Sequence, residues 1–208
     1  HTSPAELELR REPVVGGRVL AHVTEAVRSG IEARDQKLWV NVPHKPVLVL
    51  AGPTRLAQVF GNLLDNASKY TPAGGSVRVT LAERDGHAEI AVTDDGSGVS
   101  AELMPRLFES FSRGRRGIAS EVPGLGLGLA LVKRLCELHD GTVDVRSEGE
   151  GRGTEFMVRM PAVDGPLPES PASPERGKDV PSLKVLIVDD NQDAADMLAA
   201  IVEMCGHE

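Results

Sequence analysis

Two asparagines four residues apart are the first feature of this sequence that could do chemistry. Asn62 and Asn66 lie in the stretch QVFGNLLDNASKYTP, residues 58–72, and Lys69 and Tyr70 follow closely. On a helix, residues four apart share a face, so both amide oxygens would be offered to one cation. A divalent cation that bridges phosphate oxygens needs oxygen donors of this kind. The alternative, which is more frequent for an isolated asparagine pair, is a solvated helix surface.

An acidic and glycine-containing run follows at a predicted strand end. Residues 94–98 are Asp-Asp-Gly-Ser-Gly. Taken alone, this run is typical of a hydrated turn. A calcium loop of the EF-hand type is disfavoured, because neither the alternating oxygen ligands nor the glutamate at the twelfth position fits.

Three glycines precede a predicted helix further along the chain. Gly124, Gly126 and Gly128 alternate with leucines. Their amides and the helix N-terminus would form a binding site for phosphates. A dinucleotide-binding fingerprint needs GxGxxG directly after a strand, whereas GxGxG follows a polar loop here, so that interpretation fails.

The order of these stretches is more specific than any one of them. Leu107-Phe108-Glu109-Ser110-Phe111 lies between the second and the third. Together the four resemble the N, G1, F and G2 boxes of the histidine kinase ATP-binding domain. That domain belongs to the superfamily shared with gyrase, mismatch-repair and chaperone ATPases. The resemblance covers roughly residues 7–161.

The resemblance implies that ATP and Mg²⁺ are the cofactors. Asp94 would select adenine, because a buried carboxylate accepts a hydrogen bond from its exocyclic amine and repels the carbonyl of guanine. Asn66 would hold Mg²⁺, with Asn62 as a possible second ligand. The residues that the resemblance assigns to ATP are Asn62, Asn66, Lys69, Tyr70, Asp94, Gly96, Gly98, Phe111, Gly124, Gly126, Leu127, Gly128, Leu129 and Thr154.

Two positions depart from the family pattern. Leu125 stands where the family often has threonine or serine, which would remove one hydroxyl contact. Gly52 stands where an aspartate is common, although we do not expect it to contact the nucleotide.

The identity of residue 62 favours phosphoryl transfer over hydrolysis. The hydrolytic relatives commonly have a glutamate here that acts as a base toward water, and an amide cannot take that proton at neutral pH. The loop between Phe111 and Gly124 resembles the ATP lid, and Arg113, Arg115 or Arg116 could neutralise the γ-phosphate there. We therefore predict Asn62, Lys69 and Arg113 as the catalytic residues. For any one lid arginine, a solvated basic loop is at least as good an alternative.

The phosphate acceptor is expected on another part of the protein. Family members carry a phosphoacceptor histidine, within a His-Glu or His-Asp motif, on a two-helix dimerisation domain just upstream. None of the six histidines has that context: His1, His22, His44, His87, His139 and His207. The expected partners are therefore upstream dimerisation helices of the same protein, which would make the full-length protein a homodimer, and a receiver domain or response regulator.

The elements that would position these residues follow from periodicity and turn residues. Helices are predicted at 18–34, from Pro53 through the asparagine pair, at 103–107 and at 125–139. Strands are predicted at 38–42 and 47–51 as a hairpin-like pair, at 77–81 and 88–92 as a hairpin closed by Asp85-Gly86, and at 142–147 and 154–160. The predicted fold class is α+β: an α/β sandwich whose sheet is mixed and mostly antiparallel, with helices on one face.

Composition shifts suggest four segments. With the resemblance, we expect residues 1–15 to be a lead-in from a missing dimerisation domain, 16–161 the ATP-binding catalytic domain, 162–182 a linker and 183–208 the start of a receiver domain. Residues 161–181 contain six prolines, counting Pro161 and Pro181, and this composition cannot support a core. After it, an apolar strand leads to the acidic pair Asp189 and Asp190, as in a receiver, but one strand and one helix form only an incomplete βα unit.

The bulk composition excludes several classes of protein. A net charge of −8 over 208 residues argues against nucleic acid as the main partner. No apolar run reaches the length of a membrane-spanning helix, so no direct membrane contact is expected, although membrane segments upstream stay possible. Two distant cysteines suggest a reducing, cytoplasmic location.

Two other functions stay open. One is an ATPase or a serine/threonine-type anti-sigma kinase of the same superfamily, which Asn62 and the receiver-like segment disfavour. The other is a pseudo-kinase that binds nucleotide only to regulate a partner.

Overall fold

The computed structural model of the chain describes residues 11–109 and 128–168. The chain divides into two compact units, residues 1–168 and 169–208. All described residues belong to the first unit. The predicted receiver start, with Asp189 and Asp190, lies outside them.

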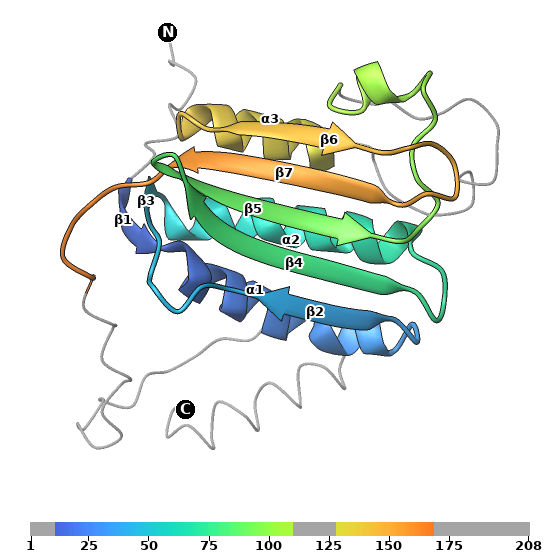
Figure 1. Ribbon diagram of the computed structural model, residues 1–208, viewed down its shortest axis with the longest axis horizontal. Helices are drawn as coiled ribbons and strands as arrows, with labels where there is room; N and C mark the ends of the chain where they lie inside the picture. The colour runs from blue at the N-terminus through green and yellow to red at the C-terminus, as the bar shows by residue number, and fades with distance from the viewer. Residues whose placement is uncertain (1–10, 110–127, 169–208) are drawn as a thin grey trace, which may run out of the picture. The chain divides into compact units, whose positions relative to one another are not determined.

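A five-stranded sheet forms the framework of the first unit (Figure 1). The strands follow the order β2-β4-β5-β7-β6, and only β2 and β4 are parallel neighbours. The strand bounds are Lys37–Asn41 for β2, Ser76–Arg84 for β4, His87–Asp94 for β5, Thr142–Arg146 for β6 and Thr154–Pro161 for β7. In β7 every second residue is buried, as expected for a sheet with one covered face.

Three helices cover one face of this sheet, and no other described helix covers the opposite face (Figure 1). They are α1 (Gly16–Glu32), α2 (Pro53–Tyr70) and α3 (Gly128–Leu138), and α2 packs against both of the others. The fold class predicted from the sequence, a mostly antiparallel sheet with helices on one face, is thus confirmed.

The central helix α2 begins as the sequence predicts. Pro53 occupies its first turn, where the missing N–H is not needed for an intrahelical bond. Six apolar side chains at helical spacing are at most 1% exposed and form the middle of the core: Leu56, Val59, Phe60, Leu63, Leu64 and Ala67. Because this stripe fixes the rotation of α2, it also fixes which way the asparagine pair faces.

The β4–β5 hairpin also matches its prediction. Asp85 and Gly86 form its turn, and both have left-handed φ angles, 49° and 71° respectively. Two consecutive residues of positive φ give a turn whose twist matches that of the flanking strands. The hairpin carries Asp94 to the end of β5.

The predicted pairing of segments 38–42 and 47–51 is wrong. β2 pairs in parallel with β4, while the second segment forms β3 (Leu48–Ala51) and pairs with β1 (Glu12–Val15) in a separate two-stranded sheet. Pro43 and Pro46 lie between the two segments and cannot donate backbone hydrogen bonds, which disfavours a tight hairpin. The parallel pair needs a crossover connection, which α2 supplies.

Smaller differences concern the ends of elements. The last residues of the predicted lead-in segment form β1, with Val14 and Val15 buried. The helix predicted at 103–107 is one 3₁₀ turn, η1 (Met104–Arg106), in which Pro105 lacks an amide donor.

Among the described residues, no helix has both the length and the apolar character needed to span a bilayer. Cys136 on α3 is fully buried, and this burial raises the pKa of its thiol to about 12. The thiol therefore stays protonated and behaves as an apolar core group.

Candidate functional site

The predicted site residues gather at one end of the sheet. There β4 begins at Ser76, β5 ends at Asp94 and β7 begins at Thr154, as the register pairs Val77 with Asp94 and Asp94 with Thr154. In Figure 1 this is the end toward which the β5 arrow points. Helix α2 brings its asparagines and its C-terminus to the same end.

The asparagine pair faces the start of α3. A Cβ atom added to Gly128 would lie 3.0 Å from Asn62 Oδ1 and 3.9 Å from Asn66 Nδ2. Residue 128 therefore leaves open the space next to both amides. The N-terminus of α3, whose free amides favour an anion, is directly beside the two side chains.

The amide of Asn62 is oriented by its own helix. Its Nδ2 donates to the Gln58 carbonyl oxygen at 2.8 Å, so its Oδ1 is the atom presented toward Gly128. This donor set fits a magnesium ion shared with phosphate oxygens, because such an ion takes oxygen ligands and needs few of them from the protein. The described residues contain no cluster of three or more His, Cys, Asp or Glu side chains that could hold a metal by itself.

Lys69 and Tyr70 stand at the exposed C-terminal end of α2. The Lys69 ammonium lies 5.2 Å from the centre of the Tyr70 ring, and the Tyr70 side chain is 40% exposed. The backbone of Tyr70 has a separate role, since its carbonyl oxygen accepts the N–H of Ser97 at 3.0 Å. That bond ties the end of α2 to the loop after Asp94.

Asp94 is a buried carboxylate at the tip of β5, with 6% of the residue exposed. Burial raises the pKa of its carboxyl group above the ordinary value, and the charge of Asp95 adds to the rise. Hydrogen bonds from the Gly96 and Thr154 backbone N–H groups act in the opposite direction. These two donors fix the orientation of the carboxylate, and the Gly96 bond measures 2.9 Å.

Asp95 has a different environment and a different role. Its slight burial would raise the pKa of its carboxyl group, but hydrogen bonds from the N–H and the hydroxyl of Ser76 outweigh this and lower the pKa. The two bonds measure 2.8 and 2.7 Å. Asp95 therefore holds the start of β4 from an exposed position, whereas Asp94 is buried.

The glycines of the loop after Asp94 are required by close backbone approaches. A Cβ atom on Gly96 would overlap the Tyr70 carbonyl, and one on Gly98, at φ 66°, would overlap the Gly149 carbonyl. Only glycine fits such positions without displacing the neighbouring backbone.

The β6–β7 turn is also part of this site, although it was not predicted to be. A Cβ atom on Gly153, at φ 70°, would overlap the backbone oxygen of Asp94, so the turn packs directly on the loop. The alternation of Gly149, Gly151 and Gly153 is a signal in the sequence, but only the pairing of β5 with β7 shows what the turn contacts.

Gln36 was also missed. This buried side chain donates to the Ser68 and Thr71 carbonyl oxygens at 2.9 and 2.5 Å, and accepts from the Ser68 hydroxyl at 2.8 Å. It holds the C-terminus of α2, and so helps to place Lys69 and Tyr70. A single glutamine gives no recognisable sequence signal.

At the end of α2 and α3 away from the asparagine pair, His139 joins the two helices. Its Nδ1 donates to the Leu135 carbonyl oxygen at 2.7 Å, and its Nε2 accepts the Gly52 N–H at 3.1 Å. The side chain is thus more than the helix cap that its position suggests, because it links the last turn of α3 to the first turn of α2. The spacing between Asn62 and Gly128 depends on how these two helices pack.

Of the remaining predicted residues, some lie in the described part of the chain and others lie outside it. Thr154 is buried beside Asp94, and Leu129 is partly buried on α3 and packs against the core. Phe108 packs edge-on against Phe156, with ring centres 6.4 Å apart. The following predicted residues lie outside the described part of the chain: Phe111, Arg113, Gly124, Gly126 and Leu127.

Comparison with known proteins agrees with this arrangement. Residues 51–164 match the family described as histidine kinase-, DNA gyrase B- and HSP90-like ATPases. The sensor protein kinase PmrB of Pseudomonas aeruginosa is 36% identical over 162 residues, which is 77% of this chain and 33% of PmrB. The sensor histidine kinase AtsR of Burkholderia thailandensis is 31% identical over 204 residues, which is 95% of this chain and 34% of AtsR. The chain thus spans about a third of the length of these relatives.

A solved structure shares the fold. The crystal structure of full-length ShkA in complex with AMPPNP superposes with a TM-score of 0.67 and 32% sequence identity, covering 77% of this chain and 33% of that one.

Proposed function

Because the chain belongs to the family of histidine kinase-, DNA gyrase B- and HSP90-like ATPases, we propose that residues 16–161 are the ATP-binding catalytic domain of a hybrid sensor histidine kinase. The reaction would transfer the γ-phosphoryl group of ATP to a histidine on dimerisation helices upstream in the full-length protein. The observation that carries the proposal is the buried Asp94 carboxylate at one end of the sheet, together with the asparagine pair of α2 beside Gly128 at the start of α3.

Asp94 would recognise adenine. Two backbone N–H groups hold its carboxylate, which leaves acceptor capacity for the exocyclic amine of the base. Guanine presents a carbonyl at that position, so it would leave a buried carboxylate facing another acceptor. Gly96, Gly98 and Thr154 would form the walls around the base.

The asparagine pair and the start of α3 would hold the phosphates. Asn66, with Asn62, would bind Mg²⁺, while Gly128 and the glycines before it would present amides to the phosphate oxygens. When bound, the ion supplies positive charge that stabilises the transferring phosphoryl group. Lys69 and Tyr70 would contact the phosphates from the end of α2, and Arg113 would act from the predicted lid.

Asn62 supports transfer to a side chain over hydrolysis. Its amide nitrogen is already engaged by the Gln58 carbonyl, and an amide has no basic lone pair with which to activate water. The residue can orient groups by hydrogen bonding, but it cannot serve as a general base.

The hybrid organisation is supported by sequence beyond residue 161. The similarity to AtsR covers nearly the whole chain, including the acidic pair Asp189 and Asp190 of the predicted receiver start. The proposed partners are therefore the dimerisation helices, in a full-length homodimer, and a receiver domain or response regulator. Since the reaction consumes ATP, the proposed location of this part is the cytoplasm.

Two alternatives remain within the same fold. A superfamily ATPase would release phosphate to water, which Asn62 disfavours. A pseudo-kinase would bind nucleotide without transferring phosphate, and this is the alternative that binding measurements alone do not exclude.

The first test is calorimetric titration of the chain with a non-hydrolysable ATP analogue, with and without Mg²⁺, and with the GTP analogue as the specificity control. We expect binding that is strengthened by Mg²⁺ and selective for adenine. A folded sample that binds neither nucleotide would overturn the proposal.

Transfer itself is tested in the longer protein that includes the dimerisation helices. ATP labelled in the γ-phosphate should yield an acid-labile, base-stable phosphoprotein, as phosphohistidine is. Nucleotide binding without any such product would favour the pseudo-kinase, and rapid phosphate release would favour the ATPase.

A further inference from the structure

We propose that Ser147 is a positioning residue for adenine recognition: its hydroxyl holds the loop that follows Asp94 in the arrangement that binds the base. The inference rests on the proposed function, since it takes Asp94 as the group that binds adenine. Ser147 lies just after β6, in a part of the chain that the sequence analysis did not assign to the site.

The Ser147 hydroxyl uses its full hydrogen-bonding capacity. It accepts the N–H of Val99 at 3.0 Å and the N–H of Gly149 at 3.3 Å, and it donates to the Gly153 carbonyl oxygen at 2.7 Å. The Gly149 carbonyl, at 3.3 Å, is a weaker acceptor for the same proton. A hydroxyl has one donor and two acceptor positions, so all of them are used.

These bonds join two backbone segments that are far apart in the sequence. One is the loop 96–99 after Asp94, and the other is the β6–β7 turn, residues 147–153. Two backbone bonds reinforce the connection: Gly151 N–H to the Ser97 oxygen at 2.7 Å and Gly153 N–H to the Gly96 oxygen at 3.1 Å. Ser147 is the side chain that connects both ends of the turn to this loop.

The bonds between loop and turn also affect the Asp94 carboxylate, because they hold the two backbone N–H groups that donate to it. One donor is the N–H of Gly96, in the loop, and the other is the N–H of Thr154, which directly follows Gly153. The oxygen of Gly96 accepts a bond from the Gly153 N–H, and the oxygen of Gly153 accepts the Ser147 hydroxyl. Both donors to Asp94 are therefore held by the contact between loop and turn. If the loop leaves the turn, the donors separate and the carboxylate loses its fixed direction.

The expected effect is on affinity for the base. When a binding-competent arrangement is populated only in part, the apparent dissociation constant rises by the inverse of that fraction. Replacing the hydroxyl leaves the Val99 N–H without this partner, which disfavours the arrangement in which the loop 96–99 is bonded to the turn. If the loop is bonded to the turn in about one-tenth of the molecules, binding would be about tenfold weaker.

The test measures binding of adenosine, ADP and MgATP to the chain carrying Ser147→Ala. We expect all three affinities to fall about tenfold, because the substitution acts on the part of the site that would bind the adenine base, which the three ligands share. The dependence on Mg²⁺ should stay as in the wild type. Ser147→Thr keeps the hydroxyl and should restore most of the affinity.

Ser29→Ala on the exposed face of α1 is the matched control, and it should bind like the wild type. A Ser147→Ala protein that is folded and binds all three ligands with wild-type affinity overturns the inference. A loss confined to MgATP also overturns it, since that result would place Ser147 on the phosphate side.

A second measurement covers the case in which Ser147→Ala does not fold. Hydrogen exchange of the wild type without ligand should show protected amides at Val99, Gly151 and Gly153, with little further protection when adenosine is added. Protection that develops only with adenosine would overturn the inference, because the loop would then be ordered by the ligand. A wild type that binds no adenine compound overturns the proposed function together with this inference, whereas normal wild-type binding with no Ser147 effect overturns this inference alone.

Discussion

The side of the proposed site that would bind the base (the base side) and the side that would bind the phosphates (the phosphate side) are built in different ways. On the base side, backbone groups from the loop 96–99 and the β6–β7 turn bond to one another around a carboxylate that is almost fully buried. On the phosphate side, the described groups are half-buried or exposed side chains on one face of α2, beside the open space at Gly128.

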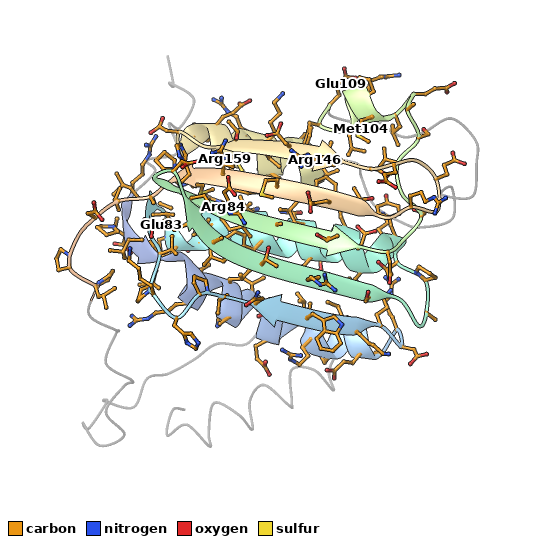
Figure 2. The ribbon with its side chains drawn as sticks, in the orientation of Figure 1. Glu83, Arg84, Met104, Glu109, Arg146 and Arg159 are labelled. Carbon is orange, nitrogen blue, oxygen red and sulfur yellow. The ribbon has the colours of Figure 1, made fainter. Side chains whose placement is uncertain are left out.

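Under the proposed function, the difference follows from what each side would recognise. Selecting one base over another needs an acceptor in a fixed position, because the penalty for the wrong base comes from a polar group left unpaired. Phosphates are bound by charge and by amide donors, which tolerate some movement and suit a group that leaves during the reaction. Arg159 lies on the sheet face away from the three described helices (Figure 2), and its Nε is 3.0 Å from Glu89 Oε1.

Gly153→Ala should have the largest effect, because it breaks the base side at its closest backbone approach. The added Cβ atom would overlap the Asp94 carbonyl oxygen at a residue with φ 70°. Strain and overlap together should lower the free energy of unfolding by about 2–5 kcal/mol, measured by urea denaturation. Gly151→Ala, at φ 72° in the same turn but with open space around it, is the control and should cost about 1–2 kcal/mol. Equal losses for both would show that the turn does not pack on the loop as described.

Asp94→Asn should separate binding from stability. The lost charge-assisted hydrogen bond should weaken ATP binding by about 1.5–3 kcal/mol, or roughly 10- to 150-fold, in a calorimetric titration. The pKa of Asp94 is raised, so the folded state favours its protonated form, and its ionisation becomes a cost as the pH rises through that pKa. At neutral pH the variant should therefore be no less stable than the wild type.

The same shift predicts a pH profile for the wild type. ATP affinity should fall as the pH is lowered through the raised pKa of Asp94, since the protonated carboxyl is a weaker acceptor. Asp94→Asn should lack this fall. An acid-dependent loss of affinity of the same size in the variant would assign the titration to another group.

Asn66→Ala tests whether the phosphate side acts independently of the base side. We expect binding of MgATP to weaken by about 1–2 kcal/mol and its stimulation by Mg²⁺ to shrink. Adenosine, which has no phosphate, should bind as it does to the wild type. A loss of adenosine affinity would mean that the two sides are coupled, and would contradict their independence.

Asp95→Asn should have the smallest effect. The carboxylate loses part of its pairing with Ser76, so the free energy of unfolding should fall by about 1 kcal/mol or less, because the site is exposed. Its pKa is lowered, so its contribution is present at neutral pH and disappears as the pH falls through the lowered pKa. The adenine-to-guanine preference should not change, and a changed preference would show that Asp95, and not only Asp94, contacts the base.

Local patterns in the sequence were enough to predict much of the fold. The spacing of Leu56 to Ala67 gave the buried face of α2, and Asp85-Gly86 marked the β4–β5 turn. The strand pairing of β2 was not predictable in this way, because a parallel partner lies across a whole helix and leaves no local signal.

The site shows the same limit. The positions that the structure brings together, such as Asn62 with Gly128 and Tyr70 with Gly96, lie in the stretches singled out from the sequence. Gln36 and Ser147 were missed because their importance comes from backbone groups of distant segments. A polar residue that bonds to backbone atoms can be recognised only when the neighbouring segments are known.

The place of β7 in the sheet has a consequence for biosynthesis. β7 is the last described strand to leave the ribosome, yet it lies between β5 and β6, and β6 has no other neighbour in the five-stranded sheet. Until residues 154–161 emerge, the nascent chain holds an unfinished sheet with an exposed strand edge, which is prone to incorrect association. Thr154 opens that same strand and supplies a donor to Asp94. The growing chain can therefore complete the proposed adenine site only in the step that completes its sheet.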